Sequence, residues 1–167
     1  LAKPVRQSML RRALHEALQA VPFQEVSSAP AMLAPENEPV LDHLSVLLVE
    51  YNMVNRTLAL EMLQRLGCDA MHAGNGVEAL DALEKQDFDV VLMDCQMPVM
   101  DGFIATRKLR EREAAKKKEP TRVVALTANA LAGDREACLA AGMNDYLAKP
   151  FTLAQLRNIL LPSKVSR

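Results

Sequence analysis

Tryptophan is absent from the sequence, and aromatic residues make up only 4% of its 167 residues. Stacking of nucleic-acid bases on aromatic rings is therefore not expected of this chain. The sequence also lacks an excess of charge of either sign, because it contains 20 basic and 21 acidic residues and has a net charge of −1. No overall charge attracts nucleic acid or an anionic membrane surface, so we expect neither as a partner.

Cysteine and long apolar segments are scarce as well. The three cysteines, Cys68, Cys95 and Cys138, are an odd number, lie far apart and form no C-x-x-C pair. This pattern predicts reduced thiols in a cytoplasmic protein and argues against a zinc site. No run approaches the roughly 18 apolar residues of a membrane helix, and no secretory signal opens the chain. We therefore expect no membrane contact by this region.

The composition divides the chain into three parts. Four of the nine prolines fall between residues 22 and 39, in a stretch without apolar periodicity, which predicts a linker over residues 21–43. Residues 1–20 carry four basic side chains and one acidic one, whereas the linker carries four acidic side chains and no Lys or Arg. The remaining body, residues 44–167, is electrically neutral and long enough for one domain with one core.

Short apolar segments alternate with helical patterns throughout the body. Three of the segments are continuous apolar runs, which are typical of parallel strands covered on both faces. Between them, apolar residues at helical spacing predict helices, one ending at Gly67 and one beginning at an N-cap, Thr152. The fold class is therefore predicted as α/β, a doubly wound parallel sheet of five strands with helices on both faces. Strands are expected at 46–50, 69–73, 90–94, 122–126 and 144–148.

Chemically active side chains follow four of these strands. Glu50 and Tyr51 end the first strand, Asp94 the third, Thr127 the fourth and Lys149 the fifth. Because sites in open α/β sheets lie beyond the carboxyl ends of the strands, we expect these side chains to converge on one crevice. Each has a simpler explanation alone, as a helix-favouring carboxylate, a turn hydroxyl or a surface lysine. Their joint placement at separate strand ends indicates a site.

Such a set is suited to phosphoryl transfer. A carboxylate can accept a phosphoryl group as an acyl phosphate, and the incoming negative charge requires cations and hydrogen-bond donors nearby. Mg²⁺ binds oxygen ligands and commonly takes only one or two carboxylates, which Glu50 and Asp94 can supply with a backbone carbonyl after Asp94. Lys149 would neutralise phosphoryl oxygens and Thr127 would donate a hydrogen bond to one.

The body resembles the receiver domain of bacterial two-component signalling, in particular the receivers of hybrid sensor histidine kinases. The resemblance covers about residues 44–162. It implies a flavodoxin-like strand order, 2-1-3-4-5, and a phosphoprotein of a phosphorelay. The motifs that carry it are VLLVEYNMVN (46–55), VVLMDCQMPVMDG (90–102), VVALTANA (123–130) and GMNDYLAKP (142–150).

The resemblance also implies a role for individual residues. Asp94 would be the phosphoacceptor, and Thr127 and Lys149 would contact the phosphoryl group. Glu50, Asp94 and the backbone of Gln96 would hold Mg²⁺. Tyr146 occupies the position of the family's switch aromatic, which turns inward when Thr127 moves toward the phosphate. The partners implied are a histidine kinase core, a histidine phosphotransfer protein, or both.

The same resemblance sets expectations for the whole protein. This region would not be an independent enzyme but part of a hybrid histidine kinase, in the cytoplasmic portion of a membrane-bound sensor. No DNA-binding module follows the last predicted helix, as expected of a receiver at the C-terminus of such a kinase. The sequence does not define the oligomeric state.

Tyr51 departs from the family pattern, which has a second carboxylate at this position. A neutral phenol cannot replace that charge at pH 7, so we expect weaker Mg²⁺ binding. Two interpretations stay open: a working receiver in which Glu50 and Asp94 suffice, or a degenerate pseudo-receiver that serves as a protein-interaction module. Enzymatic alternatives fit less well, because Gln96 replaces the second acid of a dehalogenase-type phosphatase and no phosphate loop for FMN follows the first strand.

A short internal repeat marks the start of the chain. LAKPVRQSMLRRAL at residues 1–14 matches LAKPFTLAQLRNIL at residues 147–160 in seven of 14 positions. We interpret residues 1–20 as the C-terminal helix of a preceding receiver or pseudo-receiver. The alternative is an unrelated amphipathic helix.

Overall fold

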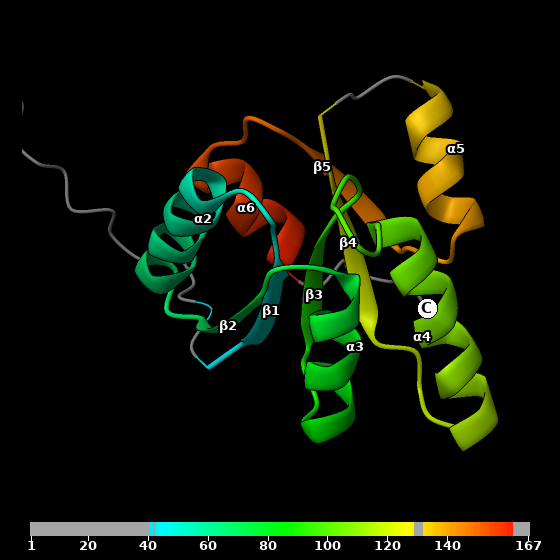
Figure 1. Cartoon of the computed structure of the whole chain (residues 1–167). Helices are drawn as coiled ribbons and strands as arrows, with labels where there is room; N and C mark the ends of the chain where they lie inside the picture. The colour runs from blue at the N-terminus through cyan, green and yellow to red at the C-terminus, as the bar shows by residue number, and fades with distance from the viewer. Residues whose placement is uncertain (1–40, 42, 129–131, 162–167) are drawn as a thin grey trace, which may run out of the picture. The chain divides into compact units, whose positions relative to one another are not determined.

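The computed structural model describes residues 41, 43–128 and 132–161. The predicted helix remnant over residues 1–20 and most of the predicted linker lie outside these residues. Within them, five strands alternate with five helices (Figure 1). The strands are β1 (Ser45–Val49), β2 (Asp69–Ala73), β3 (Val90–Asp94), β4 (Arg122–Thr127) and β5 (Asp145–Ala148). The helices are α2 (Met53–Arg65), α3 (Gly76–Lys85), α4 (Gly102–Lys116), α5 (Ala132–Ala140) and α6 (Leu153–Leu160).

The strands form one parallel sheet in the order β2-β1-β3-β4-β5, which confirms the predicted fold class and strand order. Every strand lies within one residue of its predicted ends. One of these small differences affects the site: β1 ends at Val49, so Glu50 lies in the following loop rather than in the strand. Val49 pairs with Met93, and Asp94 pairs with Leu126. The residues after β1, β3 and β4 therefore leave the sheet at the same edge.

Helices cover both faces of the sheet and create two apolar cores. Helices α2 and α6 pack over one face, around Leu48, Leu63 and Leu156. Helices α3, α4 and α5 pack over the other, around Leu47 and Leu109. Strands β1, β3 and β4 are buried along nearly their whole length, as their continuous apolar runs predict. Burial on both faces fixes the three strand ends that carry the site.

Local sequence signals explain where the helices begin and end. The side-chain oxygen of Asn52 accepts hydrogen bonds from the first-turn backbone amides of α2, and α2 ends just before Gly67, whose φ of 79° suits glycine. Thr152 caps α6 in a reciprocal arrangement with Gln155, as predicted for that threonine. The apolar side chains of α3 are not all buried, because Val77 is exposed while Leu80 lies in the core.

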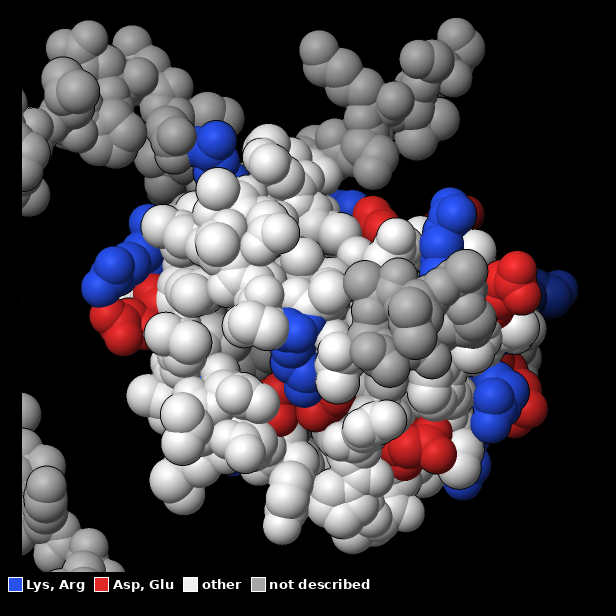
Figure 2. Space-filling view, turned by 90° about the horizontal axis from the view of Figure 1, so that it is seen from above, with Lys and Arg blue, Asp and Glu red and all other residues white. Residues whose placement is uncertain are grey.

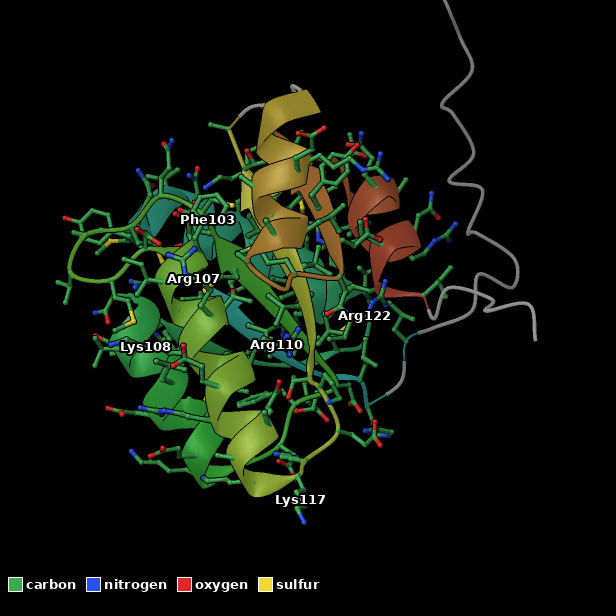
Figure 3. All side chains as sticks on the ribbon, turned by 90° about the vertical axis from the view of Figure 1, so that its right-hand side faces the viewer. Phe103, Arg107, Lys108, Arg110, Lys117 and Arg122 are labelled. Carbon is green, nitrogen blue, oxygen red and sulfur yellow. The ribbon has the colours of Figure 1, made fainter. Side chains whose placement is uncertain are left out.

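Arg110 and Arg122 form hydrogen bonds between different elements of the fold, at a distance from the strand ends that carry the site (Figure 3). Arg110 of α4 donates hydrogen bonds to the Gly142 carbonyl, to the Asn144 side chain and to buried Glu113. Arg122, at the start of β4, donates a 2.7 Å hydrogen bond to the carbonyl of Ile159 near the end of α6. None of the described helices is long and apolar enough to span a membrane.

Candidate functional site

A buried ion triad lies beyond the carboxyl ends of β1, β3 and β5. The ammonium of Lys149 is 3.0 Å from Oε2 of Glu50 and 3.0 Å from Oδ2 of Asp94. Glu50 is 2% exposed and Asp94 5% exposed. Seen with the strand ends toward the viewer, a basic group lies over acidic atoms in the middle of a largely uncharged face (Figure 2). Lys149 is thus in direct contact with two of the other predicted side chains.

Backbone groups orient both carboxylates. The backbone amide of Glu50 donates a hydrogen bond to the Ala73 carbonyl of β2. The carboxylate oxygen of Glu50 that does not face Lys149, Oε1, accepts a 2.9 Å hydrogen bond from the amide of Asn52. Oδ1 of Asp94 accepts a 3.1 Å hydrogen bond from the amide of Gln96. Each carboxylate therefore has one oxygen bound by its own loop and the other directed at Lys149.

Thr127 and Lys149 are joined through their backbones. Thr127 ends β4, one residue beyond the partner of Asp94, and is buried. Its carbonyl accepts a 2.7 Å hydrogen bond from the Lys149 amide. This backbone hydrogen bond holds the start of the loop between β5 and α6 beside the end of β4. Thr127 therefore lies next to Lys149, whose ammonium contacts Asp94.

Burial and charge shift the pKa values of Asp94 and Lys149. Burial raises the pKa of Asp94 above its ordinary 3.8, and the nearby Glu50 charge adds to the rise, although hydrogen bonds from Lys149 and Gln96 oppose it. Burial disfavours the charge of Lys149 too, but hydrogen bonds to Asp94 and Glu50 outweigh it and raise its pKa above 10.5. When two carboxylates and one ammonium are all ionised, the triad has one negative charge more than it has positive charges.

Tyr51 follows the buried Glu50 but is itself exposed. Its side chain is 61% exposed, whereas the preceding Glu50 is almost completely buried. Among the described residues, no group of three or more His, Cys, Asp and Glu side chains is arranged to hold a metal ion. Two carboxylates and backbone oxygens nevertheless match the ligands with which Mg²⁺ is commonly bound, waters completing the shell. The donor set therefore fits Mg²⁺ with one carboxylate fewer than the family pattern provides.

The other predicted residues lie at different distances from the triad. Gln96 reaches Asp94 through its backbone amide, while its side chain is exposed. Tyr146 lies inside β5, opposite Ala125, and is half-buried against the core on the α4 and α5 face. It is three residues before Lys149 and does not belong to the triad.

The structure adds residues that sequence reasoning overlooked. Asn52 both caps α2 and binds Glu50 through its amide. A side chain at Gly102 would overlap the Asp94 carbonyl, so this glycine allows α4 to approach the end of β3. The Asp-Gly pair just before a helical pattern is the signal that would have indicated it.

Strain is concentrated in the loop between β3 and α4. Val99 has φ of 69° and is 85% exposed, and the amide of Met100 donates a 2.8 Å hydrogen bond to the Pro98 carbonyl across it. This is a γ-turn with a positive φ at a β-branched residue, which is rare and strained. Strained turns gather at functional sites, and this one follows Asp94 by a few residues.

Cys95 follows Asp94 directly and is buried. Its sulfur is buried 3.9 Å from that of Cys138 in α5. Burial, followed by the neighbouring Cys138, raises the pKa of Cys95, so it carries a protonated thiol at neutral pH. A protonated, buried thiol is not a nucleophile for the site.

Comparison with known proteins identifies the family. The model of the response regulator receiver domain matches residues 46–161. The chain is 37% identical over 160 residues to the sensor histidine kinase GacS of Pseudomonas protegens, covering 96% of this chain but 17% of that protein. It is also 39% identical over 131 residues to the hybrid signal transduction histidine kinase G of Dictyostelium discoideum, covering 77% of this chain and 4% of that protein.

Solved structures agree in fold and family. The receiver domain of the sensor histidine kinase PA1611 from Pseudomonas aeruginosa, described with a magnesium ion coordinated in its active-site cleft, is 48% identical with a TM-score of 0.62. The comparison covers 71% of this chain and 94% of that one. The receiver of Saccharomyces cerevisiae Ssk1, solved with the histidine phosphotransfer protein Ypd1, is 30% identical with a TM-score of 0.68, covering 71% and 87%.

Proposed function

Because the chain belongs to the response regulator receiver domain family, we propose that it accepts a phosphoryl group from phosphohistidine on Asp94. A carboxylate oxygen of Asp94 attacks phosphorus, and the phosphorus–nitrogen bond breaks as the new oxygen–phosphorus bond forms. When the other ring nitrogen of the phosphohistidine carries a proton, the P–N electron pair goes to the departing nitrogen and the products are an acyl phosphate and a neutral imidazole. The observation that carries this proposal is the contact of one ammonium, Lys149, with two buried carboxylates at the strand ends.

The surrounding residues have distinct tasks in this reaction. Glu50, the other carboxylate oxygen of Asp94 and the backbone carbonyl of Gln96 would hold Mg²⁺, which would supply positive charge for the phosphoryl oxygens. The ammonium of Lys149 is already at the acceptor carboxylate and neutralises charge as the phosphoryl group arrives. Thr127 donates a hydrogen bond to a phosphoryl oxygen. Movement of Thr127 toward the phosphate then allows Tyr146 to turn inward and alter the surface around β5.

The receiver is proposed to be one part of a longer kinase. The chain spans 17% of the GacS sequence and 4% of the Dictyostelium kinase G, both of which are histidine kinases by name. We place it in a hybrid sensor histidine kinase, on the cytoplasmic side of the membrane. In this arrangement residues 1–20 are the last helix of a preceding receiver-like domain, residues 21–43 the linker and residues 44–167 the receiver. The kinase core supplies or receives the phosphoryl group.

A histidine phosphotransfer protein is the second proposed partner. Beside the triad, α2 exposes Met53, Val54 and Leu58, each by more than half. Val54 and Leu58 are four residues apart and share one face of the helix. An apolar surface of this kind, next to polar catalytic groups, is typical of a protein contact. The complex of the Ssk1 receiver with Ypd1 supports a partner of this class.

One observation favours a second function. Tyr51 removes a carboxylate from the metal site, and its ring is exposed. In a degenerate pseudo-receiver the fold would bind a kinase or phosphotransfer partner without being phosphorylated. The two functions differ in one measurable property, the covalent modification of Asp94.

Acetyl phosphate tests the proposal without a protein partner. The purified chain is incubated with acetyl phosphate, with Mg²⁺ or with EDTA, and its intact mass is recorded. A gain of about 80 Da, the mass of one phosphoryl group, is expected with Mg²⁺ and not with EDTA. The Asp94→Asn variant, which retains the shape of the side chain, is expected to remain unmodified. Modification of that variant would assign the acceptor elsewhere.

A further inference from the structure

Tyr51 occupies the boundary between the buried triad and the apolar surface of α2. On one side, Glu50 precedes it and contacts Lys149. On the other, Met53 and Val54 begin α2 and are largely exposed. The Tyr51 ring is 61% exposed and extends this uncharged surface to the edge of the site. Figure 2 shows a broad uncharged area beside the central charged group, on the side where α2 lies.

Two grooves lie along the surface that Tyr51 joins, and one of them includes residues of the triad. One groove is lined by Leu58 together with Glu50, Lys149 and Phe151. The other, open groove of about 550 Å³ is lined by Tyr51 and Met53 on one wall. Its opposite wall, from β2 and the loop before α3, includes His72 and Asn75. Tyr51 therefore lines a groove between the start of α2 and β2, directly after the triad residue Glu50.

We propose that Tyr51 is a specificity-determining residue that contacts the phosphotransfer partner through its ring. The inference rests on the proposed phosphoryl transfer to Asp94. A neutral, exposed phenol contributes no charge to a metal site, but it offers a large, rigid apolar face with little rotational freedom. Tyrosine is among the residues that dominate binding energy at protein interfaces. Tyr51 in place of an acid thus lowers the affinity for Mg²⁺ but adds a contact with the protein that carries the phosphohistidine.

The test compares a protein donor with a small-molecule donor. Phosphorylated Ypd1 serves as the protein donor and acetyl phosphate as the small one, each at a Mg²⁺ concentration that saturates the variant. The variants are Tyr51→Ala, which removes the ring, Tyr51→Phe, which keeps it, and Tyr51→Asp, which restores the acid. Met71→Ala is the matched control, because Met71 is an exposed apolar residue on the edge strand β2 and lies outside both grooves.

The ring contact predicts a specific pattern of KM values. For phosphorylated Ypd1, Tyr51→Ala and Tyr51→Asp should raise KM by about tenfold or more, the loss expected for one central aromatic contact. Tyr51→Phe and Met71→Ala should leave KM unchanged. With acetyl phosphate, Tyr51→Ala and Tyr51→Phe should react like the unaltered chain. A change with phosphorylated Ypd1 but not with acetyl phosphate shows that Tyr51 affects binding of the protein donor and not the phosphorylation of Asp94.

Each other outcome overturns a defined part of the proposal. An unchanged KM in Tyr51→Ala would show that the ring makes no contact, and an equal loss in Tyr51→Phe would assign the effect to the hydroxyl. Transfer from acetyl phosphate but never from phosphorylated Ypd1 would overturn the proposed contact with a phosphotransfer protein of the Ypd1 type. The absence of modification with either donor, in every variant, would instead contradict phosphoryl transfer to Asp94 itself.

Discussion

The ammonium of Lys149 lies 3.0 Å from the carboxylate of Asp94, although the two residues belong to different loops at the end of the sheet. Lys149 also contacts Glu50 at the same distance, so one cation serves two buried carboxylates. Before any phosphoryl group arrives, the site therefore holds a negative charge in excess. This arrangement favours binding of a cation and makes Asp94 costly to keep ionised.

Replacing Asp94 by asparagine should stabilise the domain at neutral pH, by about 1 kcal/mol, because it removes one of two buried like charges. Since the pKa of Asp94 is raised in the folded state, the folded chain binds more protons than the unfolded one above pH 3.8. The stability of the unaltered chain then falls as pH rises through the raised pKa. The advantage of Asp94→Asn should therefore grow from pH 3.5 to 7 in urea unfolding. An advantage that shrinks over this range would mean a lowered pKa.

Replacing Lys149 by methionine should destabilise the domain by about 3 kcal/mol at neutral pH, because it leaves two buried carboxylates without a cation. The pKa of Lys149 is raised above 10.5, so its stabilising effect is complete below pH 10.5 and is lost as pH rises through the folded-state pKa. Denaturant unfolding of both proteins between pH 7 and 12 measures the difference. A difference that already disappears below pH 10 would contradict the ion triad.

Val99→Gly should raise the free energy of unfolding by about 1 kcal/mol. Glycine adopts the positive φ of this γ-turn without strain, and the strain relieved exceeds the added chain entropy. Val99→Ala is the matched control, since alanine keeps a β-carbon and should recover much less. Urea unfolding at pH 7 compares the three proteins. Equal stability of Val99→Gly and Val99→Ala would show that the turn stores no strain.

Arg110→Ala should destabilise the domain by about 3 kcal/mol, because it leaves the buried carboxylate of Glu113 without its cation and frees the loop before β5. Arg107 on the same helix is exposed and forms no ion pair within the described part of the chain. Arg107→Ala should change stability by less than about 0.5 kcal/mol. Thermal unfolding of the two variants measures this contrast, and similar losses in both would refute the role of Arg110.

The fold was predictable because its signals are local and consistent. Continuous apolar runs defined β1, β3 and β4, and Gly67 and Thr152 marked helix ends that the structure confirms. The parallel topology then brings the strand ends together, so the meeting of Glu50, Asp94 and Lys149 followed from their positions. Here local patterning and global architecture agree.

Other features of the site depend on contacts that no pattern encodes. The close approach of Gly102 to the Asp94 carbonyl is set by how α4 packs, and the network of Arg110 joins residues more than 30 positions apart. The high exposure of Tyr51 is likewise a property of the folded loop. In the sequence Tyr51 is only a missing charge, whereas its exposure makes it a candidate contact.

The central claim is that Asp94 is phosphorylated with Mg²⁺ despite Tyr51. Its most direct test is a Mg²⁺ titration of acetyl phosphate labelling, followed by intact mass, for the unaltered chain and Tyr51→Asp. We predict a gain of about 80 Da in both proteins, with half-maximal labelling at roughly tenfold less Mg²⁺ in Tyr51→Asp because a third carboxylate joins the metal site. Labelling of Tyr51→Asp alone, with the folded, unaltered chain unmodified at every Mg²⁺ concentration, would contradict the claim and identify a pseudo-receiver.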